Sequence, residues 1–505
     1  METKPFKVGA TAGLITAAAL LWAVMAAPAM AQESADAPEA AEPTVQETIA
    51  EQRNRTTQEL FQAGQYEAAK VAAEEAVRAN EAALGEAHPH TTLAISNLAV
   101  VHQMGGDYDT AEALHQRVLS IHERELGPEH LDVAGELLAL GQMERNRGRY
   151  DAAEAALTRA HEIRLKQLGD ADLLVAESHN EIARVMRVQD RFQEAEQHQL
   201  ATLTILQTQY GPNHPVVADS LNELALIHHN ARAYDKAAPY YLRALLIREK
   251  FYGAEHMQVA RSYANLAILH HNMKQYVRAE TYYQRTLDVK TAALGPDHPD
   301  VAVTLRDLGL MMHEQGNSAE AERLLRESVT MFETALGPEA PAVAGTLGRL
   351  AELYLAEERF DEAEPLLLRT IATWETALGN DHPALARALS SLAMLHVRRQ
   401  NFDAAAPLQE RATGILETAL GADHADVATA LANLAMIRDG TGDPGAAAAL
   451  YERALALREQ ALGPEHTLVA VTLDAYAGVA RSQGRDDHAA ALEARAAAIR
   501  AAQPE

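Results

Sequence analysis

Residues 294–299 read Leu294-Gly295-Pro296-Asp297-His298-Pro299, and this hexapeptide is the junction on which the fold depends. A glycine directly after a helical leucine ends a helix well, because it adopts the left-handed backbone of a C-cap without a steric penalty. A proline suits the first turn of a helix, where its missing N–H leaves no hydrogen bond unmade. The hexapeptide therefore predicts the end of one helix and the start of the next.

The glycine of this junction recurs along the chain at a constant interval of 42 residues. A period of this size is typical of a protein built from stacked repeats, in which each unit contacts only its neighbours. Such a chain is expected to present an extended binding surface. The glycines that mark the period are Gly85, Gly127, Gly169, Gly211, Gly253, Gly295, Gly337, Gly379, Gly421 and Gly463.

A second invariant position lies twenty-six residues after each glycine, where every copy has alanine. A methyl side chain lets two helices approach closely, and a larger group would separate them. Fourteen residues after each glycine the residue is again small, as in Gly141 and Ala225, so interlocking helices are predicted. The alanines are Ala111, Ala153, Ala195, Ala237, Ala279, Ala321, Ala363, Ala405, Ala447 and Ala489, with Ala69 in a partial copy before the first glycine.

Each repeat contains two segments with apolar residues at helical spacing, and two helices per repeat follow. A short polar stretch with an aromatic residue separates them, as in Gly106-Asp107-Tyr108-Asp109 and Asn401-Phe402-Asp403. Aspartate is a favoured N-cap because its carboxylate accepts hydrogen bonds from the first backbone N–H groups. We expect Asp109 and Asp403 to cap the second helices of their repeats.

The spacing of Leu224, Ala225, Ala237, Tyr241 and Ala244 resembles the tetratricopeptide pattern. The Leu-Gly-x-x-His-Pro junction and the segment 221–225 are similar to the 42-residue repeats of kinesin light chains and related bacterial proteins. This resemblance implies an all-α fold, an α-solenoid of antiparallel helix pairs wound into a right-handed tetratricopeptide superhelix. It covers residues 45–500 with about 11 helix-pair repeats, and a tail follows at 501–505.

The N-terminus has the features of an export signal. Lys4 and Lys7 precede an apolar run from Val8 to Met25, and Ala29-Met30-Ala31 offers small residues at both cleavage-specifying positions. Residues 1–31 are therefore predicted to be a signal peptide of a periplasmic or extracellular protein, with an uncleaved membrane anchor as the alternative. Residues 32–44 are acidic and poor in bulky apolar side chains, which predicts a disordered leader.

The charge and composition exclude several classes of function. The formal net charge is −27, and removal of Glu2, Lys4 and Lys7 with the signal peptide makes it −28. This charge argues against nucleic acid as a partner and against insertion into a membrane after cleavage. The chain has no cysteine, and it contains no phosphate loop, His-Glu-x-x-His or serine-elbow motif. We therefore expect neither an enzyme nor a cofactor.

Most histidines are expected to be structural. His228-His229 and His270-His271 are paired like metal ligands, but adjacent residues of one helix point about 100° apart. Equivalent residues of neighbouring repeats are about 10 Å apart, too far for shared coordination, so no metal site is predicted. Eight other histidines lie three residues after a repeat glycine and are expected to cap or pack the junction. They are His88, His130, His214, His256, His298, His382, His424 and His466.

One position indicates where a partner would bind. Eighteen residues after the glycine the chain carries Arg145, Arg187, His229, His271 and His313, and the resemblance places this position in a concave groove. We expect the arginines to supply fixed positive charge and the histidines to add charge below about pH 6.5, which favours an acidic or carboxylate-bearing ligand. The alternative is a surface position that varies at random.

Asparagines support the groove interpretation. They recur at two adjacent positions near the middle of the first helix, and in related repeats an asparagine there holds the backbone of an extended peptide, since its amide donates and accepts at once. These asparagines are Asn97, Asn180, Asn222 and Asn265. The partner is therefore predicted to be a protein or an extended peptide.

Two functions of different classes fit these observations. The first is an exported protein–protein interaction scaffold that binds its partner in the groove. The second is a regulatory or sensory subunit of an enzymatic complex whose catalytic domain is on another chain.

Overall fold

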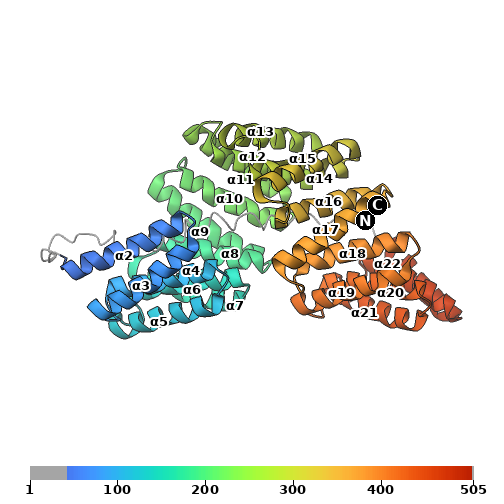
Figure 1. Cartoon of the computed structure of the whole chain (residues 1–505), viewed down its shortest axis with the longest axis horizontal. Coiled ribbons are helices and arrows are strands. Elements are labelled where there is room, and N and C mark those ends of the chain that lie inside the picture. The colour runs from blue at the N-terminus through green and yellow to red at the C-terminus, as the bar shows by residue number, and fades with distance from the viewer. Residues whose placement is uncertain (1–42, 503–505) are drawn as a thin grey trace. The chain divides into compact units, whose positions relative to one another are not determined.

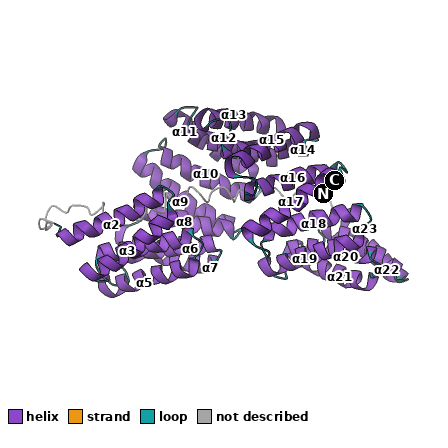
Figure 2. Cartoon of the chain, viewed as in Figure 1, coloured by secondary structure: helices purple, strands orange, loops and turns teal. Residues whose placement is uncertain are grey.

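The computed structural model describes residues 43–502, which form 22 α-helices joined by short loops. Figure 2 shows helices and loops, and no strand, in this part of the chain. The prediction of an all-α fold made of helix pairs is confirmed. The chain divides into two compact units, with the boundary between Gln275 and Tyr276.

Unit 1 extends from blue through green in Figure 1. Within it each first helix packs on the second helix of the same repeat, and each second helix packs on the first helix of the next repeat. Its helices are α2 (Val45–Gln62), α3 (Tyr66–Leu84), α4 (Pro89–Met104), α5 (Tyr108–Leu126), α6 (Leu131–Arg147), α7 (Tyr150–Leu168), α8 (Leu173–Val188), α9 (Phe192–Tyr210), α10 (Pro215–Asn230), α11 (Tyr234–Tyr252) and α12 (Met257–Asn272).

Unit 2 continues the same order from yellow-green to red in Figure 1. Here too each helix packs on the next one along the chain. Its helices are α13 (Tyr276–Leu294), α14 (Pro299–Glu314), α15 (Ser318–Leu336), α16 (Pro341–Ala356), α17 (Phe360–Leu378), α18 (Pro383–Arg398), α19 (Phe402–Leu420), α20 (Ala425–Gly440), α21 (Pro444–Leu462), α22 (Thr467–Ser482) and α23 (Asp486–Ala501). The continuous superhelix over residues 45–500 stays a prediction.

The predicted signal peptide, residues 1–31, lies outside the described residues, as does nearly all of the leader at 32–44 and most of the tail at 501–505. Thr44, at the end of the leader, is the N-cap of α2 and forms a capping box with Glu47. No helix of the part that the structure describes is long and apolar enough to cross a membrane.

The junction histidines act as N-caps, as predicted. In all eight, the imidazole Nδ1 accepts a hydrogen bond from the backbone N–H two residues further on, at 3.1–3.3 Å. Asp172 does the same with a carboxylate at 2.7 Å, whereas Ala340 provides no side-chain cap. Because a helix leaves its first N–H groups without an internal partner, each cap stabilises the start of a first helix.

The predicted caps of the second helices are wrong by two residues. The N-cap of α5 is Asp107, which accepts from the N–H of Thr110, and the N-cap of α19 is Asn401, which accepts from Ala404. The helix starts at the aromatic residue itself, so Asp109 and Asp403 lie in the first turn. There a carboxylate still interacts favourably with the positive end of the helix dipole.

The alanine position is the centre of each helix pair. All eleven alanines, including Ala69, are completely buried. The small position on the first helix is equally tight at Gly141, where an added Cβ atom would lie 2.6 Å from Leu157 Cγ. Close approach of the helices therefore explains both invariant positions, and it leaves the polar side chains to the faces that the pairs do not use for packing.

Candidate functional site

Polar side chains link the first helices of unit 1 directly to one another. Arg145 on α6 bonds to Glu181 on α8, Arg184 on α8 bonds to Glu223 on α10, and Asn265 on α12 bonds to Asn222 on α10. We call this set the first-helix ladder: Arg145, Asn180, Glu181, Arg184, Arg187, Asn222, Glu223, His229 and Asn265. Its members on α8 are three or four residues apart from Asn180 through Arg184 to Arg187, a spacing that places them on one side of the helix.

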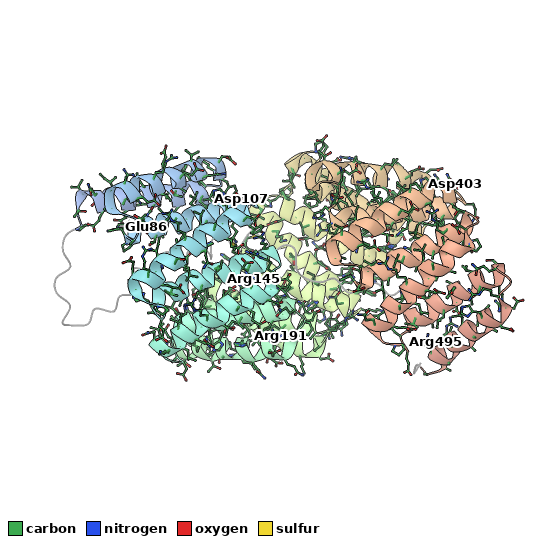
Figure 3. The ribbon with its side chains drawn as sticks, turned by 90° about the horizontal axis from the view of Figure 1, so that it is seen from below. Glu86, Asp107, Arg145, Arg191, Asp403 and Arg495 are labelled. Carbon is green, nitrogen blue, oxygen red and sulfur yellow. The ribbon has the colours of Figure 1, made fainter. Side chains whose placement is uncertain are left out.

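Arg145, labelled in Figure 3, is not a free cation. Its Nη1 lies 2.5 Å from Glu181 Oε2, and the two side chains are only 12% and 5% exposed. Glu181 also accepts from Arg184 at 2.9 Å. The expectation that Arg145 offers its charge to a ligand therefore differs from what the structure shows, because a buried carboxylate already neutralises it.

Arg187 is the remaining cation of the ladder. It forms no ion pair with any described residue, and its Nε is buried without a hydrogen-bond partner. Burial alone would raise the pKa of Glu223, but the nearby charges of Arg184, Arg187 and Arg145 outweigh this effect and lower that pKa. The ladder thus holds three arginines and two glutamates, so its cations outnumber its carboxylates by one.

His229 contributes no charge near neutral pH. It is 3% exposed, and its ring contacts Tyr234 and Tyr241 edge-on. The amide nitrogen of Asn272 lies 2.7 Å from Nε2, whereas Nδ1 has no partner among the described residues. Burial lowers the pKa of His229 to about 4, so the expectation that this histidine becomes charged near pH 6 is wrong.

The other two histidines of this position are buried to different degrees. His271 on α12 is 7% exposed, and the Nδ1 of His313 on α14 is buried without a described partner. His313 belongs to unit 2, whereas every member of the ladder belongs to unit 1. The structure therefore gathers part of the predicted stripe in one unit and assigns His313 to the other.

The asparagines differ among themselves. Asn222 and Asn265 bond to each other at 2.7 Å, so these amides connect α10 with α12. Asn97 on α4 is buried and its Nδ2 has no hydrogen-bond partner among the described residues, while Asn180 on α8 is half-buried.

The sequence reasoning missed the acidic members of the ladder. Glu181 and Glu223 stand at the repeat position that holds asparagine in Asn97 and Asn265. The signal that could have found them is the presence of glutamate at this position in the repeat that directly follows an arginine such as Arg145. Across stacked repeats that arrangement brings opposite charges together.

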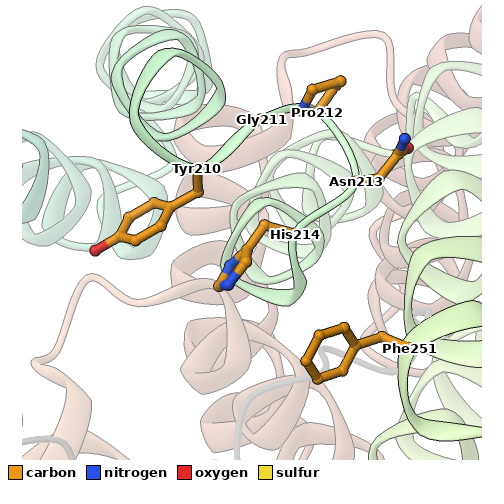
Figure 4. A pocket seen from close by; sticks show the side chains of 6 residues that line it. All are labelled: Tyr210, Gly211, Pro212, Asn213, His214 and Phe251. Carbon is orange, nitrogen blue, oxygen red and sulfur yellow. The ribbon is translucent and has the colours of Figure 1, made fainter.

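An open hollow of about 370 Å³ lies at the loop between α9 and α10. Figure 4 shows Pro212 and Asn213 on this loop and Phe251 facing it from α11. The aromatic side chains at the hollow belong to a row of ring contacts. Tyr210 stacks on His214, Phe251 contacts both His214 and Tyr252, and Tyr252 stacks on His256. No ladder residue lines this hollow. In the region 43–502 no group of three or more histidine, aspartate or glutamate side chains is arranged to hold a metal ion.

Comparison with known proteins agrees with this architecture. The family model described as tetratricopeptide repeat matches residues 60–124, 91–166, 135–207, 174–250, 216–291, 258–334, 342–418, 400–460 and 426–502. The chain belongs to the tetratricopeptide repeat family. None of the curated protein sequences matches this tetratricopeptide repeat protein.

Solved structures are similar to parts of this tetratricopeptide repeat protein. BtubC (BKLC) from P. vanneervenii has 22% identity, with 50% of this chain and 94% of that chain covered and a TM-score of 0.38. Kinesin light chain-like repeats from Podosopora anserina have 24% identity, 40% and 97% coverage and a TM-score of 0.37. The apo form of RapI has 13% identity, 73% and 98% coverage and a TM-score of 0.49.

Proposed function

We propose that this tetratricopeptide repeat protein is an exported scaffold that binds a carboxylate-bearing peptide or protein segment along the first-helix ladder of unit 1. The observation that carries the proposal is Arg187, a partly buried guanidinium that forms no ion pair with any described residue. Arg187 lies near enough to Glu223 to help lower its pKa, but that carboxylate is bound by Arg184, and a partly buried cation without an ion pair of its own is suited to an anion supplied from outside.

The neighbours of Arg187 favour a single carboxylate over a strongly acidic partner. Arg145 and Arg184 are already paired with glutamates, so the ladder offers one uncompensated positive charge. A guanidinium binds a carboxylate through two parallel hydrogen bonds, which adds geometric specificity to the attraction. A C-terminal carboxylate or one aspartate or glutamate of an extended segment meets this requirement.

The polar atoms next to the charge suit the backbone of such a segment. Asn180 is half-buried on α8, the same helix as Arg187, and its side-chain amide can both donate and accept. Backbone carbonyl groups of an extended peptide can accept from donors of this kind. The ligand would then be held by its carboxylate at Arg187 and by its main chain along α8.

The first experiment identifies the partner and measures the role of Arg187. The mature protein, starting at Gln32, is used to capture partners from the exported fraction, and calorimetry is then done with the captured partner's binding segment. Arg187→Ala is expected to weaken binding by about 1–3 kcal/mol if it removes a charge-assisted hydrogen bond. Arg243→Ala is the matched control, because Arg243 is exposed on α11 and is expected to change affinity very little.

Equal affinities of the Arg187→Ala variant and the wild type would contradict the proposed site. Binding that is also insensitive to salt would contradict an electrostatic anchor altogether. Export is tested separately by the intact mass of the protein from fractionated cells. A mature chain that begins at Gln32 supports it, and a membrane-bound species that retains Met1 contradicts it.

A further inference from the structure

Three histidines meet where α7, α8 and α9 pack together. The ring of His179 lies 4.3 Å from that of His161 and 5.0 Å from that of His198, measured between ring centroids. The Nδ1 atoms of His179 and His198 are 2.7 Å apart, and the Nδ1 of His161 is buried without a described partner. All three rings are half-buried.

Each of these histidines replaces a residue that is apolar in the other repeats. The position of His179 is leucine, isoleucine or tyrosine in all other full copies, and the position of His198 is leucine, alanine or tyrosine. The position of His161 is apolar in every other full copy except at Thr413. Three different core positions thus carry histidine in one place only, and the fold brings these three substitutions into contact.

The hydrogen bond between two Nδ1 atoms has a strict requirement for protons. One ring must donate and the other must accept, so at least one Nδ1 must be without its proton. If both rings are fully protonated, two N–H groups face each other across 2.7 Å and two like charges lie together. Neutral rings of His179 and His198 therefore allow the contact between α8 and α9, whereas two charged rings destabilise it.

The charged groups around the cluster offset only part of the repulsion between protonated rings. Glu162 and Arg164 on α7 act on His161, while Glu154 on α7, Glu194 on α9 and Arg191 in the preceding loop act on His198. The two carboxylates nearest His198 are already bound by Arg191, at 2.5 Å and 2.7 Å. Glu162 has no ion-pair partner among the described residues and favours the charged form of His161, but burial is the larger influence and lowers the pKa of that ring.

We propose that His161, His179 and His198 form an acid-sensitive joint between the repeat α6–α7 and the repeat α8–α9. Proton uptake breaks the bond between His179 and His198, places like charges between the three helices and opens the joint. The opening is local, because the positions equivalent to these histidines are apolar in the neighbouring repeats.

The direction of the pH effect follows from burial. Burial lowers the pKa of all three histidines, and the pKa of His179 falls to about 4. The opened state therefore binds more protons than the closed state between about pH 6.5 and pH 4, and acid shifts the equilibrium toward the opened state. The ion pair between Arg145 on α6 and Glu181 on α8 bridges the same two repeats, so we expect it to be disturbed when the joint opens.

Hydrogen exchange with mass spectrometry of the full mature chain tests this joint. Peptides from residues 150–210 are expected to show an opening equilibrium that increases at least about tenfold between pH 7 and pH 5, after correction for the intrinsic exchange rate. Peptides from residues 300–480 are the internal reference. The triple variant His161→Leu, His179→Leu and His198→Tyr, which restores residue types of the other repeats, is expected to lose the pH response.

A second variant covers the case in which the triple substitution does not fold. His179→Asn keeps a side-chain donor and acceptor but does not titrate, and it is expected to reduce the response by at least half. Equal pH responses of wild type and both variants would overturn the proposal. Closing of the joint by micromolar zinc at pH 7.5, reversed by a chelator, would also overturn it and indicate a metal centre.

Discussion

The imidazole Nδ1 of His298 accepts a hydrogen bond from the backbone N–H of Asp300 at 3.1 Å, and this bond starts helix α14. Seven other junctions have the same histidine, and one has Asp172 in its place. Among the junctions before the first helices α4, α6, α8, α10, α12, α14, α16, α18, α20 and α22, the one before α16 lacks a capping side chain, because Ala340 occupies the N-cap.

Ala340→Asp is expected to stabilise unit 2. The carboxylate would accept from the backbone N–H groups of the first turn, as Asp172 does at α8, and such a cap contributes about 1 kcal/mol. Thermal unfolding at pH 7 measures the effect. His298→Ala serves as the inverse control and is expected to lower stability by a similar amount. A lower melting temperature for Ala340→Asp would contradict the capping explanation.

Gly141→Ala and Gly348→Ala are expected to act in opposite directions, although both glycines lie inside first helices. An added Cβ at Gly141 would lie 2.6 Å from Leu157 Cγ, and Leu157 is completely buried, so the overpacking should cost about 1–3 kcal/mol. At Gly348 the nearest atom is 3.7 Å away, and alanine should stabilise the helix by up to about 1 kcal/mol. Urea denaturation of both variants compares them, and equal effects would contradict the close-packing interpretation.

Arg145 and Glu181 are expected to be energetically coupled. Removal of either partner leaves a buried charge with a weaker counter-charge, so Arg145→Ala and Glu181→Ala should each destabilise the protein by about 2–4 kcal/mol. The double variant should cost less than the sum, with a coupling energy of about 1–3 kcal/mol. Chemical denaturation of the four proteins completes this cycle. Strict additivity would show that the ion pair does not help to hold α6 and α8 together.

His229 is expected to remain neutral at pH 6. Its pKa in the folded state is about 4, below the ordinary value of about 6.5, so the unfolded state binds more protons between these values. The contribution of this histidine to stability is therefore present above pH 6.5 and is lost as the pH falls toward 4, by at most about 3 kcal/mol. Nuclear magnetic resonance titration of the imidazole tests this, with exposed His130 as the reference. A midpoint near pH 6.5 for His229 would contradict its burial.

The repeat architecture could be predicted because its determinants are local. Gly295 and Pro299 act through the conformation of their own backbone. The histidine of each junction accepts a hydrogen bond from the backbone N–H only two residues further on. The invariant alanines have the same steric role in every copy. Eleven copies in one chain therefore reveal a constraint on side-chain size that the sequence of a single helix would not show. The second-helix caps were misplaced because Asp107 and Asp109 have the same capping chemistry and only the backbone decides between them.

The candidate site could be predicted only in part. Arg145 and Arg187 occupy the same position of successive repeats, and nothing local distinguishes them. Arg145 meets Glu181 of the next repeat, whereas Arg187 has no carboxylate within ion-pair distance among the described residues. The following repeat brings a glutamate at the same position to both arginines, Glu181 and Glu223, but Glu223 is bound by Arg184, so the difference depends on how neighbouring side chains share each carboxylate.

By itself the sequence determined the class of fold, the length of the repeat, the helix junctions and the small residues at which helices meet, because these follow from backbone preference and side-chain volume at fixed spacing. Only the tertiary structure decided which polar groups are neutralised. It paired Arg145 with Glu181, buried His229 so that its pKa falls, and brought His161, His179 and His198 together from three helices. Charge and protonation depend on distance and on exclusion of water, and both are set only when the repeats stack.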